Sequence, residues 1–199
     1  MWVVKLGGSL NTDPLLREWL DLLAKLGGGR VTIVCGGGAF ADEVRRAQAH
    51  WHFDDLAAHN MAVLAMAQSA YLAQGLNPAL RVAASQAEIR RVLHSGHTAL
   101  WLPLGARRDR PSADAHWDVT SDSLALDLAR ELNAERLVIV KACKIPESAN
   151  LSELSAAGIL DRRFATAAAG AACTVDVIQR SELEFMRSLL LGEFRAIGT

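Results

Sequence analysis

The 199-residue sequence lacks several features that would assign a protein to a class at once. Its 21 basic and 22 acidic side chains leave a formal net charge of −1, so nothing in the charge balance favours nucleic acid or an anionic membrane surface as a partner. No apolar run approaches the roughly 20 residues that span a bilayer. The N-terminus enters a predicted strand directly, without the basic and apolar regions of a secretory signal. We therefore expect a cytoplasmic protein that binds neither nucleic acid nor membrane.

Cysteine is scarce as well. The three cysteines, Cys35, Cys143 and Cys173, lie far apart, and no C-x-x-C pair occurs. Two of them end apolar runs and the third opens one. This pattern favours small buried thiols in a reducing compartment over a disulfide framework.

The two standard phosphate-binding motifs, G-x-x-x-x-G-K-[ST] and G-x-G-x-x-G, are also missing. In their place, a β-branched strand leads into Lys5 and breaks at Gly7, Gly8 and Ser9, ahead of a predicted helix. Unpaired backbone N–H groups at the mouth of a helix favour an anion, and Lys5 adds a full positive charge at the same place. The stretch therefore predicts a phosphate site.

The same four letters, K-L-G-G, recur at residues 25–28, where they follow a helical pattern instead of a strand. There the glycines are typical of a helix C-cap and turn. The first copy therefore indicates a phosphate site only because a strand precedes it and a helix follows it.

A second junction of strand, glycines and helix occurs at Gly36, Gly37 and Gly38, after the apolar strand at residues 31–35. One triple glycine is compatible with a tight turn alone. Two such junctions on consecutive βα units favour a second anion or substrate site.

Residues 54–74 form a predicted long helix that is apolar over most of its circumference, which is typical of a helix buried between layers or against another subunit. His59, near its start, is the polar exception. It is either a hydrogen-bonded, partly buried histidine or a substrate contact.

The regular pattern fails at residues 103–117, where Arg107, Arg108 and Arg110 either clamp an anionic substrate or belong to a solvated basic loop. Residues 118–122 then offer more capping side chains than one helix start needs. The next predicted strand covers residues 136–141 and continues through Lys144. Lys141 and Lys144 lie at the end of a buried strand, where two lysines are unfavourable in a hydrophobic core but favourable for binding phosphate.

The alternation of strands and helices predicts an α/β fold, a three-layer α/β/α sandwich with a mostly parallel central sheet. In such sheets ligands gather at the carboxyl ends of the strands. The charged and glycine residues predicted there suit phosphoryl transfer from a nucleoside triphosphate, which depends on positioning and charge neutralisation. They are Lys5, Gly7, Gly8, Gly36, Gly37, Gly38, Asp122 and Lys144.

With these motifs, K-L-G-G-S at residues 5–9, G-G-G at 36–38 and T-S-D at 120–122, the sequence resembles the amino acid kinase family, which has a carbamate kinase-like fold. The strand at residues 140–144 adds a further match. Residues 58–66 and 116–122 resemble a branch of the family, the phosphate kinase that acts on an aminomethylfuran-methyl phosphate in methanofuran biosynthesis.

The resemblance implies a single domain over residues 1–199, with an acceptor-binding lobe at about 1–135 and a shortened nucleotide-binding lobe at about 136–199. It also implies ATP and Mg²⁺ as cofactors, with the metal held by phosphates and water and not by protein ligands. A small-molecule substrate and a homodimer or higher homo-oligomer are expected.

The resemblance also implies roles for single residues. Lys5, Asp122 and Lys144 would be catalytic, with Asp122 orienting the lysines. ATP would be held by Lys5, Gly7, Gly8, Ser9, and Lys141 or Lys144. The acceptor would be bound by Gly36, Gly37, Gly38, His59, Arg108, Arg110, Thr120 and Ser121.

The sequence departs from the family at residues 145–147, where Ile-Pro-Glu replaces the frequent Asp-Gly, and no G-G-M-x-x-K motif follows. We therefore expect an abbreviated or rebuilt adenine pocket. Three functions stay open: an ATP-dependent kinase of a phosphate monoester, a kinase of a carboxylate or nucleoside monophosphate, and a nucleotide-binding or storage subunit without turnover.

Overall fold

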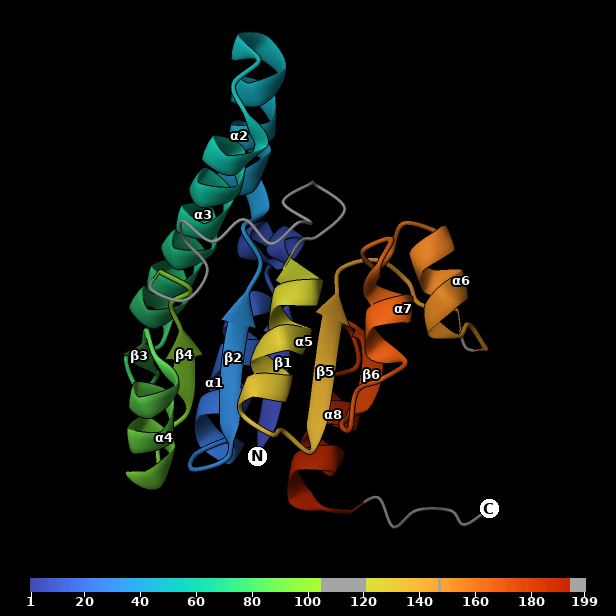
Figure 1. The fold of residues 1–199 in the computed structure, drawn as a ribbon. Helices are drawn as coiled ribbons and strands as arrows, with labels where there is room; N and C mark the ends of the chain where they lie inside the picture. The colour runs from blue at the N-terminus through green and yellow to red at the C-terminus, as the bar shows by residue number, and fades with distance from the viewer. Residues whose placement is uncertain (105–120, 147, 194–199) are drawn as a thin grey trace.

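The computed structural model describes residues 1–104, 121–146 and 148–193 (Figure 1). Within these residues, six parallel strands form one sheet in the order β3-β4-β2-β1-β5-β6. They are β1 (Trp2–Leu6), β2 (Val31–Cys35), β3 (Arg81–Ala83), β4 (Ala99–Trp101), β5 (Arg136–Lys141) and β6 (Thr174–Gln179). β1 lies in the middle, paired with β2 on one side and β5 on the other.

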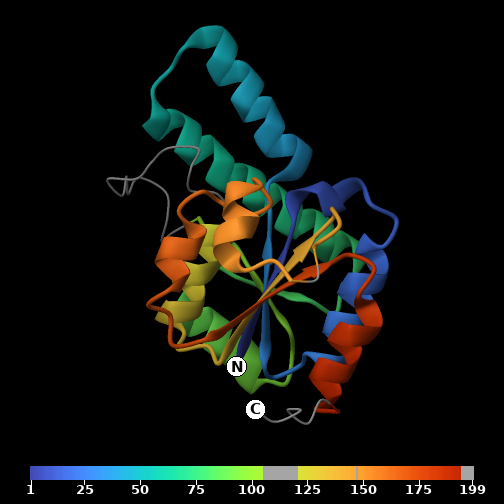
Figure 2. The same ribbon diagram turned by 90° about the vertical axis from the view of Figure 1, so that its right-hand side faces the viewer.

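Helices cover both faces of the sheet (Figure 2). The helices α1 (Leu16–Leu26), α3 (Asp55–Leu76) and α8 (Leu183–Leu191) share one core with Val4 and Leu6 of β1. The other face packs against α4 (Gln86–His94), α5 (Ser121–Glu131), α6 (Leu151–Ala156) and α7 (Phe164–Ala168), in a core that includes Val3. Because successive side chains of a strand point to opposite faces, a strand covered on both sides is apolar throughout. The predicted three-layer sandwich is confirmed.

The predicted helix at residues 54–74 is also confirmed, as α3. It begins at Asp55 because the side chain of Asp54 accepts a hydrogen bond from the backbone N–H of Ala57. With α2 (Gly38–Trp51), it forms an arm that rises beyond the carboxyl ends of the strands (Figures 1 and 2). Large apolar side chains stay exposed on this arm: Phe40, Trp51, Leu56, Met61, Leu64 and Tyr71.

Two sequence predictions differ from the structure or lie outside it. Strand β5 ends at Lys141, three residues before its predicted end at Lys144. Most of the irregular segment at 103–117 lies outside the described residues. The division into two lobes stays a prediction; in the structure β5 and β6 belong to the same sheet as β1. None of the described helices is long and apolar enough to cross a membrane.

Candidate active site

Two lysines and one aspartate meet at the carboxyl end of the adjacent strands β1 and β5. Lys5 of β1 lies opposite Ile139 of β5, and Lys141 is two residues further along the same strand. Side chains alternate along a strand, so both lysines point to the face that α5 covers. Asp122, in the first turn of α5, accepts from Lys5 Nζ at 2.5 Å and from Lys141 Nζ at 2.6 Å. The side chains of Lys5, Asp122 and Lys141 are 3%, 2% and 14% exposed.

This Lys5–Asp122–Lys141 cluster carries two positive charges and one negative charge. Burial raises the pKa of the Asp122 carboxyl, but Lys5 and Lys141 outweigh burial and hold that pKa below its ordinary value of 3.8. Burial lowers the pKa of the Lys141 ammonium, and repulsion from Lys5 acts in the same direction. When both lysines are protonated, the cluster has one positive charge in excess, and an anion placed beside it would complete the balance.

The two glycine junctions touch each other through their backbones. A Cβ added at Gly8 would lie 2.3 Å from the nitrogen of Gly38, and one added at Gly36 would lie 2.5 Å from the nitrogen of Gly8. Gly38 also has a φ of +54°, which L side chains rarely adopt. These glycines are therefore needed to bring the loops after β1 and β2 into contact.

The backbone amides of the two junctions divide into two groups. The Gly7 N–H donates to the carbonyl of Val140, and the Gly36 N–H donates to the carbonyl of Leu6, both at 2.9 Å. These two amides extend the sheet, so the expectation that the Gly7 amide holds phosphate is wrong for this structure. Gly8 and Ser9 instead open the 3-10 helix η1 (Gly8–Thr12), and Gly38 opens α2. The first N–H groups of a helix have no intrahelical acceptor, and they suit an anion.

A side-chain network fixes these helix starts. Asn11 Nδ2, in η1, donates to Ser69 Oγ of α3 at 2.7 Å. The Ser69 hydroxyl lies 3.1 Å from the carbonyl oxygen of Ala65 and 3.3 Å from that of Gly37, and both are within reach of its proton. The loop after β1, the loop after β2 and the arm are thus tied together.

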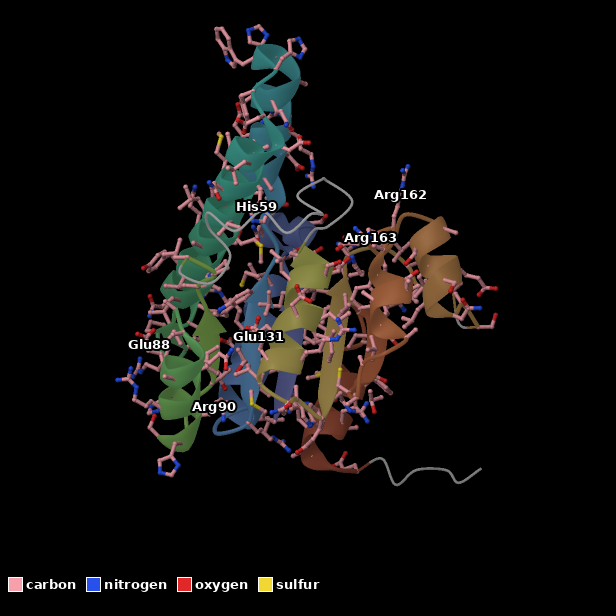
Figure 3. The ribbon with its side chains drawn as sticks, in the orientation of Figure 1. His59, Glu88, Arg90, Glu131, Arg162 and Arg163 are labelled. Atoms are coloured by element: carbon pink, nitrogen blue, oxygen red, sulfur yellow. The ribbon has the colours of Figure 1, made fainter. Side chains whose placement is uncertain are left out.

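A cavity of about 1220 Å³ opens over the cluster. Its floor contains Lys5, Gly7, Gly8, Ser9, Gly37, Gly38, Ser121, Asp122 and Lys141. The arm supplies one wall, with Arg45, Asp55, His59, Val63 and Met66. The C-terminal part of the chain supplies the other, with Ala142, Cys143, Ile159, Asp161 and Arg162. In Figure 3, His59 lies on the arm, and Arg162 lies across from it on the segment before α7.

The structure brings most of the predicted site residues to this cavity. The half-buried His59 and the helix residue Ser121 both line it. Gly36 does not line it and supports the loop contact instead. The predicted residues Arg108, Arg110 and Thr120, together with Arg107, lie outside the described residues.

Lys144 needs a correction. It was expected to be the second cation beside Asp122, but Lys141 takes that position. Because β5 ends at Lys141, the chain has left the sheet before it reaches Lys144, which is exposed and does not line the cavity.

Sequence reasoning missed Asp161, Arg162 and Arg45, which all line the cavity. Asp161 is 7% exposed, and its carboxylate accepts hydrogen bonds from the backbone and hydroxyl of Ser123. A local signal exists for the first two, because Asp161 and Arg162 follow the apolar pair Ile159 and Leu160. That step from apolar to charged residues resembles the one at Lys5.

Comparison with known proteins agrees with this geometry. The model of the amino acid kinase family matches residues 1–143. The chain belongs to this family. The match includes Lys5, Asp122 and Lys141 and ends before Asp161.

The [5-(aminomethyl)furan-3-yl]methyl phosphate kinase of Methanocaldococcus jannaschii is 29% identical to this chain over 143 residues. The aligned part covers 70% of this chain and 64% of that relative, so the chain matches less than two thirds of the relative's length.

Solved structures of similar fold include kinases of phosphorylated small molecules. The uridylate kinase of Archaeoglobus fulgidus has a TM-score of 0.71 and 18% identity, with 96% of this chain and 95% of that chain covered. The isopentenyl phosphate kinase of T. acidophilum, solved as a product complex, has a TM-score of 0.61 and 13% identity, with 95% of each chain covered. At these identities the likeness shows the fold alone.

Proposed function

We propose that this protein is a phosphotransferase that moves the γ-phosphoryl group of ATP to a small-molecule phosphate monoester. One observation carries the proposal: the buried Lys5–Asp122–Lys141 cluster lies at the floor of a cavity, beside the first amides of η1 and α2. Fixed positive charge and oriented N–H groups are what phosphoryl transfer requires from a protein. The relative from M. jannaschii is named for a kinase of a phosphate monoester, which supports the same choice of acceptor.

The residues that line the cavity fit a nucleoside triphosphate. When bound, ATP would supply the phosphoryl group, and Mg²⁺ would neutralise part of the phosphate charge. Lys5 stabilises the charge that develops on the transferred group, and Lys141 adds a second cation. Asp122 holds both ammonium groups in position before the phosphates arrive. Among the described residues no group of three or more His, Cys, Asp or Glu is placed to hold a metal, so we name no protein ligand for Mg²⁺.

We infer that the acceptor binds on the arm side and the nucleotide on the C-terminal side. The arm wall carries Arg45 and His59, whose positive or hydrogen-bonding groups suit an anionic acceptor. Arg108 and Arg110 stay predictions for the same acceptor. The opposite wall contains Ala142 and Ile159, apolar side chains of the kind that pack against a nucleotide base. Use of ATP agrees with the cytoplasmic location that the sequence predicts.

Thiol labelling tests the nucleotide side. Cys143 is exposed on that wall, Cys173 is half-buried, and burial raises the pKa of the Cys35 thiol to about 12. We expect an alkylating reagent to modify Cys143 and leave Cys35 unmodified, because the reactive species is the thiolate. A nucleotide should slow the labelling of Cys143 and leave that of Cys173 unchanged, as measured by peptide mass spectrometry. Equal labelling rates with and without nucleotide would place the nucleotide elsewhere.

An assay of ADP release with a panel of acceptors tests the function itself. The panel contains an aminomethylfuran-methyl phosphate, isopentenyl phosphate, uridine monophosphate and an amino acid carboxylate. Turnover with the aminomethylfuran-methyl phosphate or with isopentenyl phosphate supports the proposal, and turnover with uridine monophosphate or with the carboxylate favours the alternative kinases. Nucleotide binding in a titration, without turnover on any acceptor, favours a binding or storage subunit.

We further propose that the protein forms a symmetric homodimer or higher homo-oligomer through α3. The exposed apolar side chains of Leu56, Leu64 and Tyr71 on this helix support the proposal. Light scattering at micromolar concentration tests it, and a monomer would contradict it.

A further inference from the structure

Asp161 belongs to the segment between α6 and α7, and buried neighbours hold it in place. Leu160 before it is 3% exposed, and Phe164 after it is fully buried in the core on the α5 side of the sheet. The carbonyl of Asp161 accepts a hydrogen bond from the Phe164 N–H at 2.9 Å. The carboxylate of Asp161 is therefore presented to the cavity wall from a fixed backbone.

This carboxylate contacts the start of the helix that carries Asp122. Asp161 Oδ2 accepts from the backbone N–H of Ser123 at 3.0 Å and from Ser123 Oγ at 2.8 Å. The Ser123 N–H lies in the first turn of α5, where a helix has no acceptor of its own. A carboxylate at this end also complements the helix dipole. Asp161 thus caps α5 from a segment 38 residues away in the sequence.

Asp161 also acts electrostatically on the cluster. Burial and repulsion from Lys5 lower the pKa of Lys141, and the negative charges of Asp122 and Asp161 oppose this effect. Asp122 contacts Lys141 directly, whereas the carboxylate of Asp161 contacts Ser123 in the first turn of α5. The side chain has no need to touch a substrate in order to influence the cluster.

We propose that Asp161 is a positioning residue: it fixes the first turn of α5 and thereby holds Asp122 between Lys5 and Lys141. This proposal rests on the proposed phosphotransferase function. Small displacements matter at such a site, because transition-state stabilisation depends on charges that are already in place before the reaction. Asp161 lies beyond residues 1–143, so the match to the family does not assign it a role.

Three variants separate the contributions of Asp161. Asp161→Asn removes the charge and keeps the shape, whereas Ser123→Ala removes one hydrogen-bond donor and keeps the charge. Asp176→Asn is the matched control, because Asp176 is a partly buried carboxylate ion-paired to Arg136, away from the cavity. We expect Asp161→Asn to lower kcat on the order of tenfold or more, Ser123→Ala by about threefold, and Asp176→Asn to leave kcat unchanged. The KM values for ATP and acceptor should change little.

The pH profile provides a readout that a purely structural role would not move. Without the Asp161 charge, the pKa of Lys141 falls further, so Asp161→Asn should lose activity at a lower pH on the alkaline side. Ser123→Ala keeps the charge and should keep the wild-type profile. The proposal is overturned if Asp161→Asn keeps the wild-type kcat and the wild-type pH profile. It is also overturned if Asp176→Asn lowers kcat as much as Asp161→Asn does.

Amide hydrogen exchange separates this proposal from the proposed function, because it needs no turnover. Asp161→Asn should speed exchange in the first turn of α5 and leave the exchange of α8 unchanged. If the wild-type protein transfers no phosphoryl group, the proposed function fails and the exchange result still decides whether Asp161 fixes α5. Unchanged exchange in α5 overturns the proposal on either outcome.

Discussion

The chain contains the letters K-L-G-G twice, at residues 5–8 and at residues 25–28, and the two copies have opposite environments. In the first copy, Lys5 is the next-to-last residue of the central strand β1, its side chain is 3% exposed, and it pairs with Asp122. In the second copy, Lys25 lies in the last turn of α1 and is exposed. The same four residues therefore give a buried, ion-paired lysine in the first copy and a solvent-exposed lysine in the second.

The chain direction explains the difference. After the first copy a helix begins, so backbone N–H groups are presented and an anion is favoured. The second copy ends a helix, so carbonyl groups are presented and a cation is favoured: the Arg30 guanidinium donates to the carbonyl of Leu26. The polarity of the neighbouring helix, more than the glycines themselves, decides what the segment can bind.

Removal of the Asp122 charge is expected to give the largest effect on stability. Asp122→Asn leaves Lys5 and Lys141 buried without a carboxylate, which should lower the free energy of unfolding by about 3–5 kcal/mol. Lys25→Met, the control at the second copy, should change it by less than about 0.5 kcal/mol. Denaturant titration at neutral pH measures both.

The pH dependence has a defined sign. The folded-state pKa of Asp122 lies below 3.8, so its contribution is present above that pH and is lost as the pH falls through the folded-state value. On the acid side of neutral pH, the difference in the free energy of unfolding between wild type and Asp122→Asn should therefore narrow only as the pH falls below 3.8 towards the folded-state pKa. A gap that narrows near neutral pH would contradict the assignment.

The charge of Lys5 should matter more for the chemical step than for binding. Lys5→Met keeps the apolar stem and should lower kcat roughly 10²–10³-fold, or on the order of 3–4 kcal/mol, because one preorganised charge is lost. ATP affinity should fall much less, since amides and Mg²⁺ still hold the phosphates. Single-turnover rates and a nucleotide titration measure the two effects, with Lys25→Met as the control. If Lys5→Met leaves the rate of the chemical step unchanged, the catalytic role proposed for Lys5 is wrong.

Glycine-to-alanine substitutions in the two K-L-G-G copies test the comparison between them. A Cβ at Gly8 would lie 2.3 Å from the Gly38 nitrogen, and one at Gly28 would lie 2.4 Å from the Gly96 carbonyl oxygen. Both substitutions to Ala should cost roughly 1–3 kcal/mol of stability, as thermal unfolding would show. We expect Gly8→Ala alone to lower kcat. Gly75→Ala, with no neighbour within 4 Å of the new Cβ, should be neutral or slightly stabilising.

Much of this could be predicted from the sequence because the patterns are local. The period of apolar residues predicted α3 at residues 54–74, and the structure has it at 55–76 with Asp54 as its cap. Lys5 and Asp122 were also identified, because Lys5 lies near the end of a strand and Asp122 near the start of a helix at the carboxyl edge of the sheet. The period of apolar residues indicates where the helices and strands form, and the strands determine which residues lie at the carboxyl edge of the sheet.

The choice between Lys141 and Lys144 could not be predicted in the same way. Ala142 and Cys143 continue the apolar pattern of β5, but its last neighbour on the β6 side is Gln179, opposite Lys141. Strand ends depend on where the partner strands end, and this information is not local. Asp161 is a similar case: the apolar pair before it is a local signal, but nothing near it in the sequence indicates the contact with Ser123.

The pairing of Lys5 with Asp122 also has a consequence for the order of folding. The two residues are 117 positions apart, and β5, which covers one edge of β1, follows later still. During synthesis, about two thirds of the chain must therefore be made before Lys5 has its counter-ion and before the second edge of β1 has a neighbouring strand. Such long-range closure is slow and leaves an unpaired strand edge open to other chains. The residue pair that we propose for phosphate binding is thus also a contact that folding completes late.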